Sequence, residues 1–480
     1  MTMPADAPLL EIVAVDLFER DVKLRLPFRF GIVTLTEAPQ AFARVRIRLA
    51  DGREAVGVSA EVLAPKWFDK NPDLSNEENF DQLRAALDIA SALYRDAGAR
   101  TAFGLYAAAY HAQIDAGAAR GLNPLVACFG PALLDRAILD GLCRVHDVPF
   151  AAAVAANLPG IAVTALTPDL TDFDLPAYLA TLKPAAGVHA RHTVGLVDPI
   201  ADNPDPVGDG LPETLTDVIA AYGHRYFKVK VGGDLGSDLD RLTEIAAVLD
   251  AAGAPYHVTL DGNEQYDDVD GIVALWRAMV AEPRLERFRS AVVMIEQPIR
   301  RHVALEADIG PLAAERPVII DEADGDLDAF PIARALGYAG VSSKSCKGFY
   351  KSILNAARCA AWNREGRGGP YFMSGEDLTT QAGVAVQQDL ALATLLGITH
   401  VERNGHHYVD GMRGVPHEEQ AAFVNAHPDL YHWAGDTARL TIREGKVALG
   451  SLDRPGFARG ADPDFAAMRT MTMPPTQRER

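Results

Sequence analysis

Six charged side chains recur in this sequence at intervals that suit the successive strands of an α/β protein. They are two lysines, three acidic residues and a further lysine: Lys228, Lys230, Asp261, Glu296, Asp321 and Lys344. The steps from Lys230 onward are 31, 35, 25 and 23 residues, and one β-α-β unit takes roughly 30 residues. Each residue is therefore expected at the end of a strand, one strand further round than the residue before it.

The alternation within these strands gives the charged side chains a common direction. In the segment 227–231 both lysines share a face opposite Phe227, Val229 and Val231. The strands of a parallel barrel are buried on both faces, with helices outside and packed side chains inside. We expect the apolar set to face the helices and the charged set to face the interior, where an isolated charge is very costly.

Three carboxylates and three amines at one barrel mouth need a joint chemical role. Asp261, Glu296 and Asp321 would repel one another, and at least one would become protonated, unless a divalent cation lay among them. A set of oxygen ligands with room for water suits Mg²⁺, with Mn²⁺ as the alternative. The sequence thus predicts a metal site.

The lysine-bearing strands flank the acidic ones, so their amines can reach opposite faces of a bound substrate. A proton α to a carboxylate is very weakly acidic, and a cation on the carboxylate oxygens stabilises the enediolate that forms when the proton leaves. A neutral lysine can remove that proton. A second lysine opposite can return it from the other face, protonate a leaving group or stabilise developing charge.

The elements that must position these residues begin after Pro149. Short apolar runs alternate there with helical segments over about 250 residues, the length of a (β/α)₈ barrel. The candidate strands are Phe150–Ala156, Arg225–Val231, Tyr256–Asp261, Ala291–Glu296, Val318–Asp321, Tyr338–Lys344, Tyr371–Ser374 and Ile398–Glu402. The stretch 158–222 is too long for one crossover and is rich in Pro, Asp and Gly, so it is predicted to be an insertion after the first strand.

The first 147 residues predict a separate α+β unit. Three arginines alternate with apolar residues in 44–49 and the turn Asp51-Gly52 follows, a pattern typical of an antiparallel meander. The capping box Ser75-x-x-Glu78 begins a helix, and further helices are expected over 102–116 and 132–142. We predict three parts: 1–147, the barrel in 148–435, and a tail in 436–480 that packs back on the first part.

Five short motifs resemble the enolase superfamily in its muconate lactonizing enzyme-like subgroup, within the mandelate racemase/muconate lactonizing enzyme family. They occur in the family's order along most of the chain: Lys228-x-Lys230, Asp261-x-Asn263, Glu296-Gln297-Pro298, Asp321-Glu322, and Lys344 in Lys344-Ser345-Cys346-Lys347-Gly348. The resemblance implies a modified TIM barrel with an α+β capping domain formed by the N-terminal region and the C-terminal tail.

The resemblance also implies roles for individual residues. Lys230 and Lys344 would be the acid/base pair, and Lys228 would support Lys230 electrostatically or bind the substrate carboxylate. Asn263 and Glu322 are expected beside the metal ligands rather than among them. Lys347 is the alternative sixth-strand lysine if the register is three residues out.

Two departures from the family pattern weigh against the mandelate racemase-like subgroup and against a contact with a dipeptide amine. The seventh strand carries no histidine like that of mandelate racemase-like members, and Glu402-Arg403-Asn404 stands where dipeptide epimerases have an Asp-x-Asp motif. We expect a racemase or epimerase that acts on a small carboxylate substrate. The alternatives are a lyase, dehydratase or cycloisomerase that uses the same intermediate, and a non-catalytic relative that binds a metal or ligand.

Histidines raise two further hypotheses. His189 and His192, with Arg191 between them, lie in the predicted insertion and are candidates for covering the substrate. His406-His407 and His400 suggest a second metal site, but adjacent histidines point apart on a strand, so a loop surface is the preferred interpretation.

Composition sets the remaining expectations. The 480 residues carry 46 basic and 65 acidic side chains, a net charge of −19, which argues against nucleic acid or an anionic membrane as a partner. The sequence contains no run of 18 apolar residues, so no transmembrane helix is expected. The first 20 residues do not resemble a signal peptide. The four cysteines lack disulfide or metal spacing, so a cytoplasmic protein is expected, and we expect a homo-oligomer.

Overall fold

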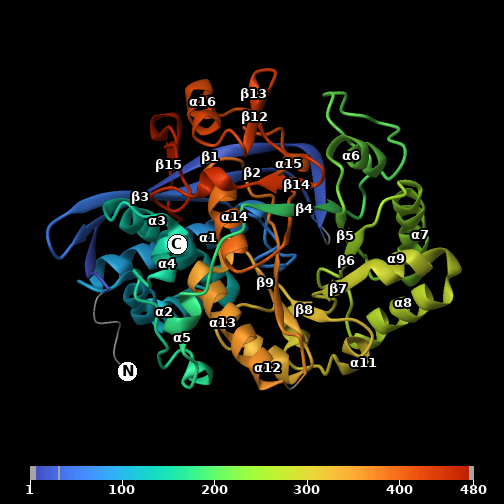
Figure 1. The fold of residues 1–480 in the computed structure, drawn as a ribbon, viewed down its shortest axis with the longest axis horizontal. Helices are drawn as coiled ribbons and strands as arrows, with labels where there is room; N and C mark the ends of the chain where they lie inside the picture. Colours follow the sequence, from blue (N-terminus) through green and yellow to red (C-terminus); the bar gives the residue numbers. More distant parts are fainter. Residues whose placement is uncertain (1–6, 31–32, 367, 475–480) are drawn as a thin grey trace.

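The structure, a computed structural model, describes residues 7–30, 33–366 and 368–474. Three long antiparallel strands form its N-terminal meander: β1 (Leu10–Phe30), β2 (Val33–Leu49) and β3 (Glu54–Val62). The alternation predicted for 44–49 is confirmed, because Val45, Ile47 and Leu49 are buried in the core of this sheet. The short strand β15 (Arg469–Thr470) pairs with β1 and brings the C-terminal segment onto the same sheet (Figure 1).

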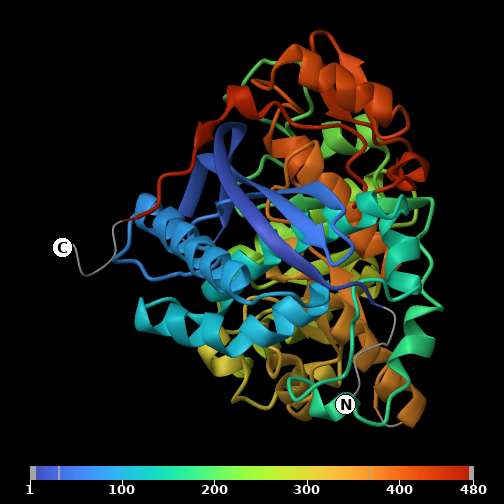
Figure 2. The same ribbon diagram turned by 90° about the vertical axis from the view of Figure 1, so that its left-hand side faces the viewer.

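Three helices follow: α1 (Asn76–Asp96), α2 (Ala102–Ala119) and α3 (Pro124–Val145). Helices α1 and α3 pack against the meander, and α2 packs against both of them (Figure 2). The predicted capping box is present, with Ser75 and Glu78 each bonding the other's backbone N–H. Helix α3 begins eight residues before the predicted segment 132–142 and is buried along most of its length. It lies between the meander and the barrel.

A closed barrel of eight parallel strands follows. Its strands are β4 (Gly187–Val194), β5 (Tyr226–Lys230), β6 (His257–Asp261), β7 (Val292–Glu296), β8 (Val318–Ile320), β9 (Gly340–Ser343), β10 (Phe372–Gly375) and β11 (His400–Glu402). Neighbours pair in chain order, and β11 pairs with β4 to close the ring. The short strand β14 (Lys446–Ala448) pairs antiparallel with β4 and is not one of the eight strands of the ring.

Helices surround the barrel. Those of ten residues or more are α7 (Leu235–Ala251), α8 (Val269–Ala281), α13 (Phe349–Glu365), α14 (Val384–Leu395) and α16 (His417–Ala426). The shorter ones are α4 (Phe150–Ala155), α5 (Leu175–Leu179), α6 (Leu215–Tyr222), α9 (Glu286–Ala291), α10 (Arg301–Ala304), α11 (Gly310–Ala313), α12 (Ala329–Ala335) and α15 (Gly405–Tyr408). Single 3₁₀ turns occur at Pro168–Leu170, Pro283–Leu285, Ser345–Lys347, Gly450–Leu452 and Phe465–Ala467.

After α16 the chain forms a hairpin of β12 (Tyr431–Ala434) and β13 (Thr437–Leu440). The four cysteines are buried and form no disulfide. No helix within the described residues has the length and apolar character needed to cross a membrane.

The first barrel strand lies elsewhere than predicted. The run 150–156 forms helix α4, and the first strand is β4, inside the stretch 158–222 that the sequence suggested was an insertion. A short alanine-rich apolar run can form either a helix or a strand, and alanine is the best helix former. The sequence does not predict strand β4, because this strand carries the buried polar residues Arg191, His192 and Thr193 instead of an apolar run. The other seven predicted strands all contain the observed ones or overlap them.

Candidate active site at the barrel mouth

The structure brings the predicted site residues to one end of the barrel. The adjacent strands β5, β6 and β7 pair so that Lys230 lies beside Asp261 and Asp261 beside Glu296. Asp321 follows directly on β8, and Lys344 directly on β9. All nine predicted residues are buried: Lys228, Lys230, Asp261, Asn263, Glu296, Asp321, Glu322, Lys344 and Lys347.

Lys228 occupies the centre of a group of carboxylates. Its Nζ lies 2.7 Å from Glu376 Oε2, 2.8 Å from Glu296 Oε2, 3.0 Å from Asp261 Oδ2 and 3.1 Å from Glu402 Oε2. Burial opposes its charge, but these four carboxylates outweigh burial and hold the pKa of Lys228 well above its usual value. Lys228 is therefore a permanent cation in this state.

Two of the four carboxylates, Glu376 and Glu402, were not among the predicted site residues. Glu376 follows β10 directly, and Glu402 ends β11. Arg191, on the unrecognised strand β4, donates hydrogen bonds to Glu376 and to the Gly375 carbonyl. The rule that charged residues at strand ends face the barrel mouth would have found both acids if it had been applied to the last two strands.

Lys230 and Lys344 approach the mouth from opposite sides. Lys230 Nζ lies 2.9 Å from Asp261 Oδ2, and Lys344 Nζ lies 2.6 Å from Asp321 Oδ2. Their strands, β5 and β9, are the second and sixth of the eight, so they stand across the barrel from each other. The Asp321 carboxylate raises the pKa of Lys344 despite its burial, so Lys344 carries a proton in this state.

Lys344 and Lys230 line one small cavity of about 30 Å³, and Lys347 does not line it. Lys347 Nζ instead lies 2.8 Å from Asp324 Oδ2 and 2.8 Å from Ser342 Oγ, behind Asp321. Of the two sixth-strand lysines considered in the sequence, Lys344 is the one that lines the cavity.

Asn263 and Glu322 form a pair next to Asp261. The Asn263 amide donates to Glu322 Oε1 at 2.6 Å, and the Asn263 backbone N–H donates to Asp261 Oδ1 at 2.7 Å. Burial raises the pKa of Glu322 to about 7.

A loop from the N-terminal part covers the cavity. Trp67 lies over Lys344, with the ammonium 4.2 Å from the ring centroid, and Phe28, Leu35 and Ala64 complete the apolar side of the cavity. Arg301 ties this loop to the barrel, because it donates to the carbonyls of Trp67 and Phe68 while it pairs with Glu264.

The donor atoms at the mouth suit a hard cation. The buried oxygens there that have no hydrogen-bond partner include Glu296 Oε2, Asn263 Oδ1 and Glu322 Oε2. Glu296 Oε2 is close to Lys228 Nζ, but the contact lacks hydrogen-bond geometry. Burial and the neighbouring acids raise the pKa of Glu296 well above its usual value, so further positive charge here would be stabilising.

The predicted ligands Asp261, Glu296 and Asp321 are not drawn together as tightly as they would be around an ion. In the part of the chain that the structure describes, one group of three potential ligand side chains has its donor atoms within 4.8 Å of one another, and it consists of histidines. The three carboxylates are instead paired with lysines. Their assignment as metal ligands stays a prediction.

The histidines named in the sequence are distributed over two places. His189 and His400 pair across the β4–β11 seam, and His400 stacks on Tyr226 at 4.6 Å between ring centroids. His406 and His407 lie on helix α15, and the rings of both are near His192. The predicted loop surface for His406-His407 is wrong, because His407 is buried and both ring nitrogens of His406 are shielded from solvent.

Comparison with known proteins identifies the fold. No family model and no curated protein matches the sequence, but solved structures match over nearly the whole chain. N-succinyl Arg/Lys racemase from Bacillus cereus has a TM-score of 0.60 and 15% identity, and the match covers 95% of this chain and 96% of that one. A dipeptide epimerase from Enterococcus faecalis, complexed with Mg and L-Leu-L-Tyr, has a TM-score of 0.59 and 13% identity, with 93% and 99% covered.

A third structure, muconate lactonizing enzyme from Pseudomonas fluorescens complexed with muconolactone, has a TM-score of 0.57 and 17% identity, with 95% of this chain and 98% of that chain covered. The chain thus has the fold of the enolase superfamily, a modified TIM barrel with an α+β capping domain. The fold class predicted from the sequence is confirmed.

Proposed function

We propose that this protein is an enzyme of the enolase superfamily that removes the proton α to the carboxylate of a small substrate, and that it is a racemase or epimerase. The observation that carries the proposal is the position of Lys230 and Lys344. These two amines come from opposite strands of the barrel and line the same cavity, which is the arrangement that proton removal from one face and return to the other requires.

The protonated state of Lys344 supports a division of labour between the two lysines. With its pKa raised by Asp321, Lys344 holds a proton that it can deliver to a carbanion. Lys230 lies across the cavity, where its amine can accept the α-proton when it is neutral. In the reverse direction the roles exchange, since an enzyme that acts on both enantiomers needs one acid and one base at a time.

Mg²⁺ is the cation that the carboxylates would hold, with Asp261, Glu296 and Asp321 as its ligands and Asn263 and Glu322 beside them. The structurally similar dipeptide epimerase is complexed with Mg, and the unpartnered buried oxygens of Glu296, Asn263 and Glu322 agree with this assignment. When bound, the ion would supply positive charge to the substrate carboxylate and so lower the barrier to loss of the α-proton.

The remaining residues shape the environment of the reaction. Lys228 keeps its charge among four carboxylates and orients Glu296 and Asp261. Trp67, Phe28 and Leu35 exclude water from the cavity, which strengthens each charge interaction inside it. A cavity of about 30 Å³ has room for little more than a water molecule. The residues that cover it must therefore move when a substrate enters.

The test is α-proton exchange in D₂O. The Mg²⁺-loaded protein is incubated with single enantiomers of N-acyl amino acids, dipeptides and sugar acids, and with cyclic dienoic acids, and deuterium entry is followed by NMR. We expect Lys230→Met and Lys344→Met each to abolish racemisation, while each retains exchange with one enantiomer only. Lys446→Met, which changes an exposed lysine on β14, should behave as wild type.

Two results would contradict the proposal. If one lysine variant lost all exchange and the other kept full turnover, the chemistry would need a single base, as in a syn elimination, and a lyase would replace the racemase. If no substrate exchanged and Mg²⁺ raised the melting temperature of wild type and Asp261→Asn equally, both the reaction and the metal site would be excluded for that panel and this cation.

A further inference from the structure

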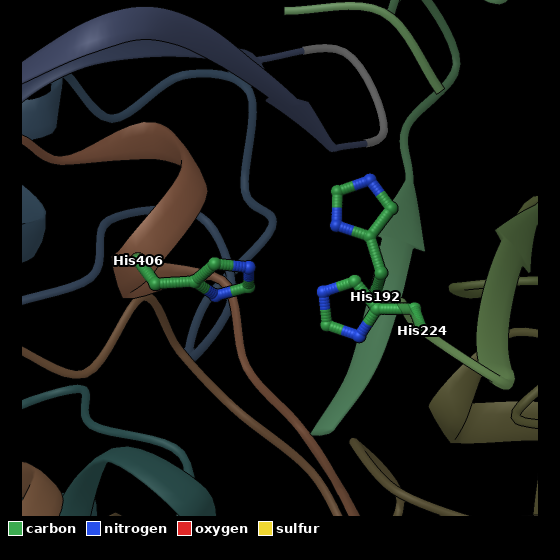
Figure 3. A group of neighbouring side chains, drawn as sticks. All are labelled: His192, His224 and His406. Carbon is green, nitrogen blue, oxygen red and sulfur yellow. The ribbon is translucent and has the colours of Figure 1, made fainter. Parts of the chain in front are cut away.

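Three imidazoles meet on the outside of the barrel wall. His192 lies on β4, His224 precedes β5, and His406 lies on α15 after the last strand. One ligand atom from each lies within 4.8 Å of the other two. Figure 3 shows the His406 ring directed toward the rings of His192 and His224.

This cluster is separate from the barrel mouth although it shares a strand with it. Side chains alternate along β4: Arg191 and Thr193 bond Glu376 and Glu402 inside the barrel, so His192 between them faces outward. Its strand neighbour on β5 is Phe227, also on the outer face. Such a position normally carries an apolar residue that packs against a helix.

The ring nitrogens of the cluster are unsatisfied. Nδ1 of His192, Nε2 of His224 and both nitrogens of His406 are buried without a hydrogen-bond partner. Leaving buried polar atoms unpaired costs about 1–3 kcal/mol each. One such atom from each of three side chains in one place indicates a ligand that the three rings share.

His224 is held in the tautomer that a ligand would need. Its Nδ1 lies 2.9 Å from the Ala190 carbonyl oxygen, which is an acceptor only, so the ring proton belongs on Nδ1 and Nε2 presents its lone pair. A histidine that ligates a metal typically donates its other N–H in this way. The rings are also neutral, because burial lowers the pKa of all three, that of His224 to about 4.

We propose that His192, His224 and His406 bind one divalent ion of borderline softness, and that this ion is Zn²⁺. Neutral imidazole favours Zn²⁺ over Mg²⁺, which prefers oxygen. Nitrogens bound about 2.0–2.1 Å from a tetrahedral ion lie roughly 3.3 Å apart, so the rings need to close by about 1.5 Å at most, a movement that side-chain rotation can supply.

Three protein ligands leave a fourth position for water or another small ligand. His406 borders a cavity of about 220 Å³ that Tyr222, Arg403 and Arg439 also line, whereas His192 and His224 do not line it. An ion would therefore enter past the His406 ring.

The ion would hold the barrel together where it closes. Its ligands come from the first strand, from the segment before the second strand and from the helix after the eighth strand. Because these segments are far apart in the sequence, one ion would link the two ends of the barrel and should stabilise the folded state.

The experiment uses the full chain without a histidine tag, stripped of metal by a chelator and dialysed against excess Mg²⁺, so that the carboxylate site does not take up Zn²⁺. Zn²⁺ is titrated calorimetrically, and bound metal is counted by mass spectrometry after dialysis. We expect one Zn²⁺ per chain. His224→Gln and His406→Gln should each weaken its affinity by at least ~100-fold, more than the loss of an outer partner would.

Two control variants separate this site from others. His257→Gln changes an exposed histidine on β6, and Asp261→Asn changes the barrel mouth; both should keep Zn²⁺ affinity. Equal affinity in His224→Gln, His406→Gln and His257→Gln would overturn the proposal, as would loss of Zn²⁺ in Asp261→Asn alone.

A measurement on the unaltered protein guards against variants that do not fold. Co²⁺ added to the metal-free chain should give the intense visible bands of a four-coordinate nitrogen site, and one equivalent of Zn²⁺ should remove them. Only the weak spectrum of six-coordinate Co²⁺, or a melting temperature that Zn²⁺ does not raise, would show that the three histidines hold no such ion.

Discussion

Glu61 shows how burial sets the behaviour of a single residue outside the cavity. It lies on β3, pairs with Arg136 at 3.1 Å and accepts a hydrogen bond from Ser345 at 3.0 Å, next to Lys344 in the chain. Burial outweighs these partners and raises the pKa of Glu61 from 4.5 to about 7. The folded protein therefore keeps this carboxyl protonated at a pH where the unfolded chain has lost the proton.

The sign of the resulting pH dependence follows from proton linkage. Between pH 4.5 and 7 the folded state binds more protons at Glu61 than the unfolded state, so its contribution to stability is complete below pH 4.5 and is lost as the pH rises to 7. We expect Glu61→Gln to gain stability relative to wild type over this interval, by roughly 3 kcal/mol in total.

The measurement is denaturant unfolding of both proteins at about pH 5 and about pH 8, on either side of most of this titration. Glu54→Gln, an exposed acid on the same strand, is the control and should show no such trend. Parallel pH profiles for Glu61→Gln and Glu54→Gln would show that Glu61 titrates normally in the folded protein.

At the scale of elements, the close contact of β3 with α3 positions the meander against the barrel. A Cβ at Gly57 would lie 1.8 Å from the Ala137 carbonyl oxygen and 2.3 Å from the Gly141 backbone nitrogen. Strand and helix backbones therefore touch at this point, and only glycine permits the approach. Helix α3 also packs against the turn that follows Lys344, so its position affects the candidate active site.

We expect Gly57→Ala to destabilise the protein by about 1–3 kcal/mol or more, because a rigid helix backbone must move to admit the methyl group. Thermal unfolding measures the effect. Gly236→Ala is the matched control: it lies in the first turn of α7, has a single atom within 4 Å at 3.8 Å, and should be neutral or slightly stabilising. Equal melting temperatures for the two variants would contradict the close approach.

At the scale of the whole molecule, the cap and the barrel meet through Arg301. The guanidinium joins Glu264 on the barrel to the carbonyls of Trp67 and Phe68 on the covering loop. Lys70 adds a second link, with its Nζ 2.8 Å from Glu264 Oε2 and 2.6 Å from the Asn263 carbonyl oxygen. The loop that closes the cavity is therefore held by charged hydrogen bonds, which can break and form again.

Arg301→Lys should loosen this loop, because the guanidinium makes four hydrogen bonds from three nitrogens, whereas a lysine has three donors on a single nitrogen. We expect faster hydrogen exchange in residues 64–70 and slower α-proton exchange on the substrate. Arg300→Lys, in the adjacent exposed residue, is the control. Unchanged hydrogen exchange in Arg301→Lys would mean that other contacts hold the loop.

The sequence by itself determined the features that depend on residues close together in the chain. Strands β5 to β9 each end in a charged side chain or are followed directly by one. The regular spacing and consistent phase of these side chains predict the barrel and place Lys230, Asp261, Glu296 and Lys344 at its mouth. Periodicity and spacing are properties of local sequence, so they can be read along the chain.

Only the tertiary structure decided the rest. Strand β4 lacks an apolar run, and its polar residues Arg191 and Thr193 bond Glu376, directly after β10, and Glu402 on β11, which are 185 and 209 residues away. No local sequence pattern predicts such partners. His406 is likewise distant in sequence from His192 and His224, and it meets them only because the eighth strand pairs with the first. Closure of the barrel brings these residues together. It depends on pairing between strands far apart in the chain, so the sequence of one strand does not predict it.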